Sequence, residues 1–346
     1  MSAGAIHANH CFNNFTIPLS PSYRIWPSIA IGIIFTIALT GNLAIIFFTI
    51  SIKKLHTSTN ILIANVALND LFITIIVMPI CFTISLTLVW PFSCTFCIIG
   101  GFLDMILYNN ALCSLAILSI NRYYAIVCAM DPNFVAKMSI KRAKIMAVGV
   151  WMYSAIWAAP PLFGWNRYVF YFSKLMCNMQ QRDPSLYVTV VTLFCTVLPT
   201  FTILYCSGRV VITLWKNAKN SSIATSNRQR IERRVTSMIG LILLAYVLCI
   251  APNFVAGSLY AFDSSNSEDL SKYNDFQTIA TIVYFMNSAV NPIINGAMNP
   301  YLRRAVKQQY HWPRCLAAWR HHSVNPITAT KKVRKSFSQY VFNTSE

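Results

Sequence analysis

Long stretches of this chain carry no charged side chain. Residues 55–121 hold only two charges, Asp70 and Asp104. Five other runs contain no Lys, Arg, Asp or Glu at all: 25–52, 145–166, 184–208, 235–262 and 276–302. Each run exceeds the roughly 20 apolar residues that a helix needs to cross a bilayer, and residues 55–121 are long enough for two more spans. The pattern therefore predicts seven membrane-spanning helices, with the two chain ends on opposite sides.

These runs also predict the domain organisation. We expect an all-α membrane protein whose seven-transmembrane helix bundle occupies residues 24–298, after an extracellular N-terminus, 1–23. The expected helices are 25–51, 59–87, 94–127, 142–163, 186–214, 229–260 and 274–298. Residues 299–311 mix apolar and basic side chains, which is typical of a short amphipathic helix at the cytoplasmic membrane surface. Residues 312–346 combine basic residues with Ser and Thr, and predict a disordered cytoplasmic tail.

Composition excludes a water-soluble protein. Apolar residues make up 55% of the chain and charged residues 11%, against about 25% charged residues in soluble domains. A surface facing water cannot be covered with so few charges. The six His are scattered through loops and tails, with no spacing typical of a metal site and no catalytic constellation, so we expect neither an enzyme nor a metal centre.

The charges follow the expected topology. The N-terminal segment and the segments after the second, fourth and sixth helices carry five basic and five acidic residues. The opposite face carries 23 basic residues against three acidic ones. The net charge of +18 is therefore no sign of nucleic-acid binding, and the positive-inside rule predicts a cytoplasmic basic face and C-terminus. The N-terminus, with a glycosylation sequon at Asn14, is then extracellular.

Two cysteines fall on the predicted extracellular side, where disulfides persist. Cys97 begins the third helix, and Cys177 lies midway along the segment that joins the fourth and fifth helices. A bridge between them would hold that segment over the mouth of the bundle. Cys94 is a competing partner, and Cys11 is a further unpaired candidate.

Asp104 is an acidic residue in the extracellular third of the third helix. It lies seven residues after Cys97, or ~10 Å along a helix, and eighteen residues before Arg122, which is five whole turns. Asp104 and Arg122 therefore project from one face of the helix. A buried carboxylate at this depth favours a cation, and an aromatic box for an ammonium group would be completed by Tyr108, Phe254, Thr281, Tyr284 and Phe285. The alternative is that Tyr284 or another local donor holds Asp104 and that no ligand meets it.

Asp70 lies in the middle of the second helix. An ionised carboxylate there is costly unless it is paired or hydrated. Other helices offer polar partners at a similar depth, namely Asn42, Asn287, Ser288 and Asn291. We expect these residues to form a polar network inside the bundle.

Nearly every predicted helix contains a short motif of its own. The motifs are Gly41-Asn42, Leu68-Asn69-Asp70, Asn121-Arg122-Tyr123, Trp151, Pro199, Cys249-Ile250-Ala251-Pro252, Asn287-Ser288 and Asn291-Pro292. In this order and spacing they resemble the rhodopsin-like family of G-protein-coupled receptors. The resemblance implies a plasma-membrane receptor that converts extracellular ligand binding into activation of a heterotrimeric G protein.

The resemblance also implies roles for polar residues of the bundle. Arg122 and Glu232 would form an ionic lock between the third and sixth helices, unless both are solvated interface charges. Asn121 replaces the acidic residue typical of the family, so we expect easier release of Arg122 and some ligand-independent activity. The Asp70 network would hold water and a sodium ion. Ala111 replaces a common helix-three hydroxyl, so water alone is the alternative.

Features of three branches of the family are mixed in this chain. An aspartate at the position of Asp104 binds the ligand amine in the aminergic branch, whereas residues 160–165 resemble opsins and Asn121-Arg122-Tyr123 resembles melatonin receptors. Covalent binding of retinal needs a lysine in the seventh helix. Residues 276–302 contain none, and Phe285 occupies the matching place, which excludes covalent retinal.

A small amine is therefore the expected ligand. The alternatives are an opsin-related receptor for a peptide or lipid, a non-signalling partner of another receptor, and a channel or transporter with Asp70 and Asp104 along its path. In the tail, palmitoylation of Cys315 would add a membrane anchor. Phosphorylation of the tail by receptor kinases would recruit an arrestin.

Overall fold

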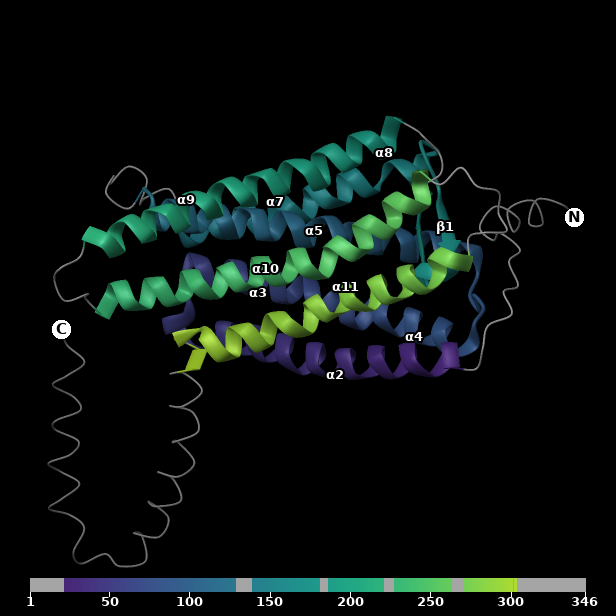
Figure 1. Ribbon diagram of the computed structural model, residues 1–346, viewed down its shortest axis with the longest axis horizontal. Coiled ribbons are helices and arrows are strands. Elements are labelled where there is room, and N and C mark those ends of the chain that lie inside the picture. Colours follow the sequence, from purple (N-terminus) through teal and green to yellow (C-terminus); the bar gives the residue numbers. More distant parts are fainter. Residues whose placement is uncertain are drawn as a thin grey trace, which may run out of the picture. The chain divides into compact units, whose positions relative to one another are not determined.

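Seven long helices lie alongside one another in the computed structural model, as Figure 1 shows. The structure describes residues 22–128, 139–180, 186–220, 227–262, 271–300 and 302–303. The helical segments are α2 (Ser22–Ser51), α3 (Ser58–Phe72), α4 (Met78–Thr87), α5 (Cys94–Ile126), α7 (Ile140–Ala158), α8 (Leu186–Val191), α9 (Leu198–Asn220), α10 (Asn227–Phe262) and α11 (Ser271–Met298). Segments α3 and α4 form one continuous rod, as do α8 and α9, which confirms the prediction of a seven-helix bundle.

Six of the seven rods are long and apolar enough to cross a membrane. The seventh, α11, has 28 residues but is more polar, because its buried face carries several amide and hydroxyl side chains. Those side chains are Gln277, Thr278, Thr281, Asn287, Ser288, Asn291 and Asn295. The outer surface shows the reverse pattern: large apolar residues such as Ile33, Val148 and Phe201 are exposed.

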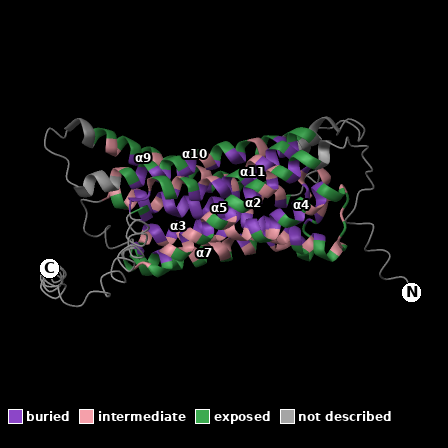
Figure 2. Ribbon diagram, turned by 90° about the horizontal axis from the view of Figure 1, so that it is seen from below, coloured by how far each residue is buried: buried purple, intermediate pink, exposed green. Residues whose placement is uncertain are grey.

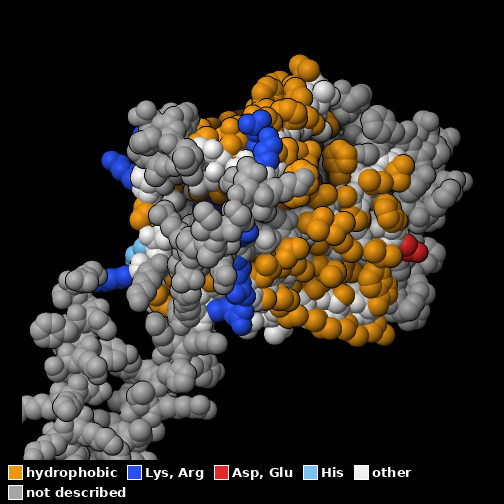
Figure 3. All heavy atoms as spheres, turned by 60° about the vertical axis from the view of Figure 1, so that its left-hand side comes forward, with side chains coloured by type: hydrophobic (Ala, Val, Ile, Leu, Met, Phe, Trp, Pro, Cys, Tyr) orange, Lys and Arg blue, Asp and Glu red, His pale blue; other side chains and the backbone are white. Residues whose placement is uncertain are grey.

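Polar side chains therefore lie inside the bundle and apolar ones outside it. Figure 2 shows buried residues gathered between the rods and exposed residues along their outer sides. In Figure 3, apolar side chains cover most of the described face, and Lys and Arg gather toward one end of it. This distribution suits hydrocarbon around the middle of the bundle, because lipid tails cannot satisfy polar groups.

Two of the rods contain a π-helical turn next to a proline. The turn Ile73–Val77 precedes Pro79 at the start of α4, and the turn Thr192–Val197 precedes Pro199 in α9. Proline has no N–H and its ring clashes with the carbonyl four residues earlier. A wider turn at that point absorbs the clash, so both rods continue through their prolines.

Side-chain caps fix the starts of several helices. The hydroxyls of Thr57, Ser93 and Ser139 accept hydrogen bonds from the backbone N–H of Asn60, Phe96 and Arg142. Hydroxyl residues at this position satisfy one of the N–H groups that a helix leaves unpaired at its beginning. These caps set the first residues of α3, α5 and α7 close to the predicted positions.

The segment between α7 and α8 differs from the prediction. The fourth helix ends at Ala158 rather than at residue 163, because Pro160 and Pro161 turn the chain into a short 3-10 segment. Beyond it lies an antiparallel hairpin of β1 (Tyr168–Tyr171) and β2 (Met176–Met179), in a segment predicted to be a plain loop. Figure 1 shows β1 at one end of the bundle.

Several predictions concern residues that the structure does not describe. Asn14 and Cys315 lie outside the described residues, as does the whole predicted tail, 312–346. Of the expected amphipathic helix, 299–311, the structure describes residues 299, 300, 302 and 303, and the last three of these are helical. The backbone of Glu232 is helical within α10, but its side chain lies outside what is described.

The packing of α2 against α11 depends on a residue without a side chain. A Cβ atom at Gly41 would lie 2.5 Å from Cβ and 2.6 Å from Cγ of Pro292, whereas a Cβ at Gly32 of the same helix would meet nothing within 4 Å. The close approach therefore needs glycine at one of the two positions but not at the other.

We predict that Gly41→Ala destabilises the protein by about 1–3 kcal/mol, because the methyl group forces α2 and α11 apart. Gly32→Ala is the matched control and should leave the melting temperature unchanged or slightly raised, since alanine favours helix. Thermal unfolding of both purified variants in one lipid or detergent measures the difference. Equal melting temperatures would contradict the packing described here.

Candidate functional site

A cavity of about 560 Å³ opens into the bundle near the hairpin. Its walls come from the hairpin, α5, the rod of α8 and α9, α10 and α11. The six residues predicted to bind the ligand all line this cavity: Asp104, Tyr108, Phe254, Thr281, Tyr284 and Phe285. Phe254 is the most exposed of them, at 47%. The volume lies within the range of about 300–1,000 Å³ that small-molecule sites occupy.

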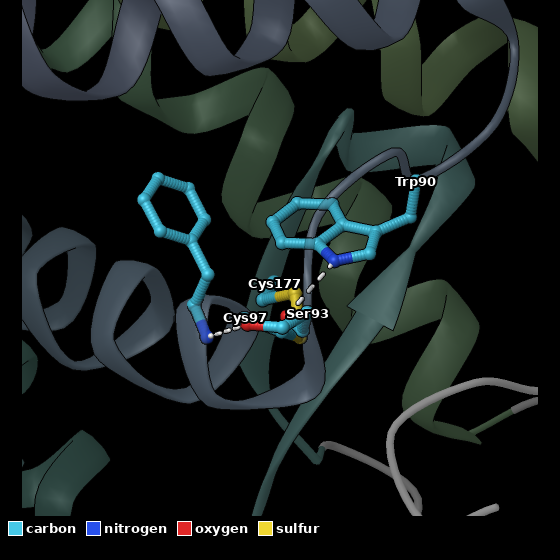
Figure 4. Close-up of a disulfide and its surroundings, with 5 residues drawn as sticks. Trp90, Ser93, Cys97 and Cys177 are labelled. Atoms are coloured by element: carbon cyan, nitrogen blue, oxygen red, sulfur yellow. Dashed lines mark hydrogen bonds between the residues drawn. A yellow bond between two sulfur atoms is a disulfide. The ribbon is translucent and has the colours of Figure 1, made fainter. Parts of the chain in front are cut away.

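The hairpin is bound covalently to α5. A disulfide joins Cys97 to Cys177, with 5.4 Å between their Cα atoms, as the sequence had indicated. Cys94, which the sequence left open as an alternative partner, forms a separate disulfide and does not bond to Cys97 or Cys177. The indole of Trp90 packs beside the Cys97–Cys177 bridge and donates to the carbonyl of Ser93 at 3.3 Å, as Figure 4 shows.

Polar and steric contacts also fix the hairpin in place. The hydroxyl of Tyr168 donates to the carbonyl of Ala158 at 2.7 Å. Gly101 of α5 lets the hairpin approach, because a Cβ there would lie 2.7 Å from the Tyr168 ring and 3.2 Å from the Cys177 carbonyl. The hairpin therefore forms a fixed wall of the cavity.

Asp104 is 8% exposed and receives a hydrogen bond from the hairpin. Nδ2 of Asn178 donates to its Oδ2 at 2.9 Å. The local donor expected as an alternative thus exists, but it is Asn178 rather than Tyr284. The other carboxylate oxygen, Oδ1, forms no hydrogen bond with any residue that the structure describes.

Lys174 brings a positive charge to the same cavity. It ends the short turn Phe172–Lys174 between the two strands, and its Nζ lies 5.5 Å from the centre of the Tyr171 ring. Burial lowers the pKa of Lys174 to about 8, and the carboxylate of Asp104, which favours the charged form, opposes that shift. The ammonium group is therefore still mostly charged at neutral pH.

Lys174 and Asn178 were not among the predicted site residues. They lie three residues before and one residue after Cys177, so the predicted bridge was the available signal. A disulfide to the helix that carries Asp104 brings the neighbours of Cys177 close to that carboxylate. Which side chains face the cavity depended on the strand register, which was not predicted.

Aromatic rings and two unpaired polar atoms line the cavity around Asp104. The ring centres of Tyr108 and Tyr284 are 6.0 Å apart, and those of Tyr284 and Phe285 are 5.5 Å apart. The hydroxyl of Tyr284 and Nδ2 of Asn109 are buried and have no hydrogen-bond partner among the described residues. Buried polar groups are nearly always paired, so these atoms need a ligand or water.

The predicted network around Asp70 is present. Ser288 donates to Oδ1 of Asp70 at 3.2 Å, and Nδ2 of Asn291 donates to Oδ2 at 2.8 Å. Nδ2 of Asn42 donates to the Ser288 carbonyl at 2.9 Å. The side-chain oxygens of Asn42, Asn287 and Asn291 have no partner among the described residues. With the carboxylate, they form a set of oxygen donors that suits water or a hard cation.

Arg122 contacts α3 and its own neighbour in α5. Its guanidinium donates to Oδ1 of Asn121, at 2.8 Å from NH2, and to the hydroxyl of Thr59. Thr59 in turn donates to Oδ1 of Asn121 at 2.9 Å. The amide of Asn121 therefore supplies the acceptor that a carboxylate would supply, but without its charge. Tyr123 faces Tyr205 of α9, with 6.2 Å between ring centres.

The predicted lock between Arg122 and Glu232 stays a prediction, since the side chain of Glu232 is not described. Both ends of α5 nevertheless carry a buried charge held by hydrogen bonds. Asp104 lies at the hairpin end and Arg122, 7% exposed, at the opposite end. One rigid helix of 33 residues thus connects the cavity to the other face of the bundle.

Comparison with known proteins agrees with this geometry. Residues 41–294 match the family model described as "7 transmembrane receptor (rhodopsin family)". The chain is 30% identical to a blue-sensitive opsin of Carassius auratus over 270 residues, which are 76% of this chain and 74% of the opsin. It is 29% identical to human melanopsin over 292 residues, which are 80% of this chain and 59% of melanopsin.

A solved structure supports the fold alone. Squid rhodopsin superposes with a TM-score of 0.70 and 22% identity, covering 87% of this chain and 92% of the other. The family consists of multi-pass membrane receptors that bind extracellular ligands and signal through G proteins, not of enzymes. Because the family model covers most of the chain and all seven rods are present, this protein belongs to the rhodopsin family of seven-transmembrane receptors.

Proposed function

We propose that this receptor is activated by a small extracellular amine whose ammonium group pairs with Asp104. The observation that carries the proposal is that Asp104 lies in a cavity lined by aromatic rings. Its Oδ1 has no hydrogen-bond partner among the described residues. An ammonium group gains from a carboxylate and from the faces of aromatic rings. The unpaired atoms of Tyr284 and Asn109 support a polar ligand over a purely apolar one.

Signalling then follows from a shift between two states of the bundle. An agonist must bind the active state better than the resting state. In the structure, Arg122 is held by Asn121 and Thr59, an arrangement that we assign to the resting state. Release of Arg122 and outward movement of α10 would open a groove for a G-protein helix. Receptor kinases and an arrestin acting on the tail belong to this proposal, as do an extracellular N-terminus and a cytoplasmic C-terminus at the plasma membrane.

A lipid ligand is the second candidate, because the relatives compared above are named as opsins. Phe285, at 1% exposure, lines the cavity and offers no amine for a Schiff base. A retinoid would therefore be held without a covalent bond. The charge of Asp104 favours the amine over such an apolar ligand.

We predict that Asp104→Asn abolishes the response to a panel of biogenic amines, because the variant keeps a hydrogen-bond partner for Asn178 but lacks the charge. A G-protein recruitment assay that covers all G-protein classes measures the response, with surface expression as the control. An unchanged dose–response curve of Asp104→Asn for these amines would contradict the amine proposal. A response to retinoids alone would favour the second candidate.

We predict that Asn121→Asp lowers ligand-independent activity about fivefold. A carboxylate holds the Arg122 guanidinium more tightly than an amide does, by about 1 kcal/mol or more. Thr59→Val, which removes a hydroxyl bonded to both residues, should raise the same activity. Basal G-protein activation per receptor at the surface is the measurement. Equal activity in the wild type, both variants and mock-transfected cells would contradict the prediction.

We also propose that the oxygen donors around Asp70 bind a sodium ion. Sodium chloride, compared with choline chloride at the same concentration, should raise the melting temperature of the wild-type receptor, because an ion that binds the native state stabilises it. Asp70→Asn removes the charge and should lose that difference between the salts. The same difference in both proteins would assign the network to water alone.

A further inference from the structure

We propose that the cavity takes a zwitterionic aromatic amino acid, whose ammonium group pairs with Asp104 and whose carboxylate pairs with Lys174. This inference rests on the proposed function, since it narrows the ligand that engages Asp104. It adds Lys174 as the residue that would separate amino acids from simple amines. Three observations support it: the fixed position of Lys174, the charge of the cavity and the nature of its walls.

The turn that carries Lys174 is anchored on both sides. The hydroxyl of Thr278 in α11 donates to the carbonyl of Ser173 at 3.1 Å. On the other side, Cys177 is bonded to Cys97 of α5. Between these anchors, buried Leu175 takes a left-handed backbone conformation with φ of 53°, which is unusual for a residue other than glycine. Lys174 is therefore held at the cavity by the fold.

Two charged side chains line the cavity among the described residues, Asp104 and Lys174. Each acts electrostatically on the other, but the described residues form no ion pair within 4.0 Å with either. Oδ1 of Asp104 has no hydrogen bond among these residues, and the Lys174 ammonium lies over the Tyr171 ring. Neither charge is therefore neutralised by an ion pair with a described residue, and both line the cavity that a ligand would enter.

Charge balance favours a zwitterion over a simple amine. The cavity with Asp104 and Lys174 has a formal charge of zero, because it pairs one acid with one base. A monoamine would add a positive charge beside Lys174, and a carboxylic acid would add a negative one beside Asp104. Uncompensated charge is costly in a buried site. A ligand that carries one ammonium and one carboxylate leaves the cavity neutral and gives each protein charge a partner.

The walls indicate the side chain of that amino acid. Tyr108, Tyr284 and Phe285 present aromatic surface next to Asp104, which suits an aromatic ring. The Tyr284 hydroxyl would accept from an indole N–H or pair with a phenol, and Nδ2 of Asn109 would donate to a phenol oxygen. Tryptophan and tyrosine combine such a ring with the zwitterionic head.

Matched probes test the inference on the full-length receptor in lipid nanodiscs. Tryptophan, tryptamine and tryptophan methyl ester form one set, and tyrosine, tyramine and tyrosine methyl ester the other. The amine lacks the carboxylate, and the ester keeps its bulk without the charge. Affinities come from the ligand-dependent rise in melting temperature. We expect one of the amino acids to bind at least about tenfold more tightly than its amine and its ester.

Variants assign that preference to one residue. Lys174→Met should reduce the affinity for the amino acid about tenfold or more, while the affinity for the amine stays equal or rises, since a repelling charge is gone. Lys174→Arg keeps the charge and should keep most of the preference. Lys144→Met, at an exposed lysine of α7, is the control for loss of a lysine elsewhere and should change nothing.

The outcomes separate this inference from the proposed function. The inference would be overturned if the amines bind as tightly as their amino acids, or if the preference for the amino acid persists in Lys174→Met. Lys174 would then serve only as an electrostatic partner of Asp104. If binding of those amines is lost in Asp104→Asn, the proposed function stands alone. Two results would count against both the inference and the proposed function. One is that all six probes bind Asp104→Asn as tightly as the wild type, and the other is that none of the six binds the wild type.

Discussion

The structure depends on one constraint: hydrocarbon around the bundle cannot satisfy a polar group, so polar side chains of the spans gather inside, where other helices, water or a ligand can pair with them. This is why exposed Ile, Val, Leu and Phe cover the outside while amides and hydroxyls fill the interior. It is also why α11 is the least apolar rod. Its inner face carries the residues that meet Asp70, and lipid contacts only its outer face.

The same constraint makes α5 the central element. Nδ2 of Asn110 donates to Asn69 of α3 at 2.9 Å, and Ser114 accepts from Asn65 of α3 at 2.8 Å. The indole of Trp151 in α7 donates to the same Asn65 at 3.0 Å. These bonds hold α3, α5 and α7 in register. One helix, packed in this way against two others, therefore carries both Asp104 and Arg122.

The hairpin changes the charge and the hydrogen bonding of the cavity. From α5 alone, Asp104 is an isolated acid that favours any cation. With the hairpin in place, it has an amide donor in Asn178 and a nearby positive charge in Lys174. The cavity is then a nearly neutral site with both signs of charge. The charges that a ligand would meet in the cavity thus come from the hairpin as well as from the helices.

The sequence predicted the membrane spans, the Cys97–Cys177 bridge and six of the residues that line the cavity. Charge spacing and helical periodicity are local properties of the sequence, and a bilayer requires long uncharged helices. The π-helical turns before Pro79 and Pro199 and the end of the fourth helix at Ala158 were not predicted. The prolines mark these places in the sequence, but a proline alone does not decide between a wider turn that lets the helix continue and a turn that ends it. The positions of Lys174 and Asn178 required the pairing of Tyr168 with Met179 and of Tyr171 with Met176. Strand register is set by contacts between distant residues, so only the tertiary structure decided which charges share the cavity.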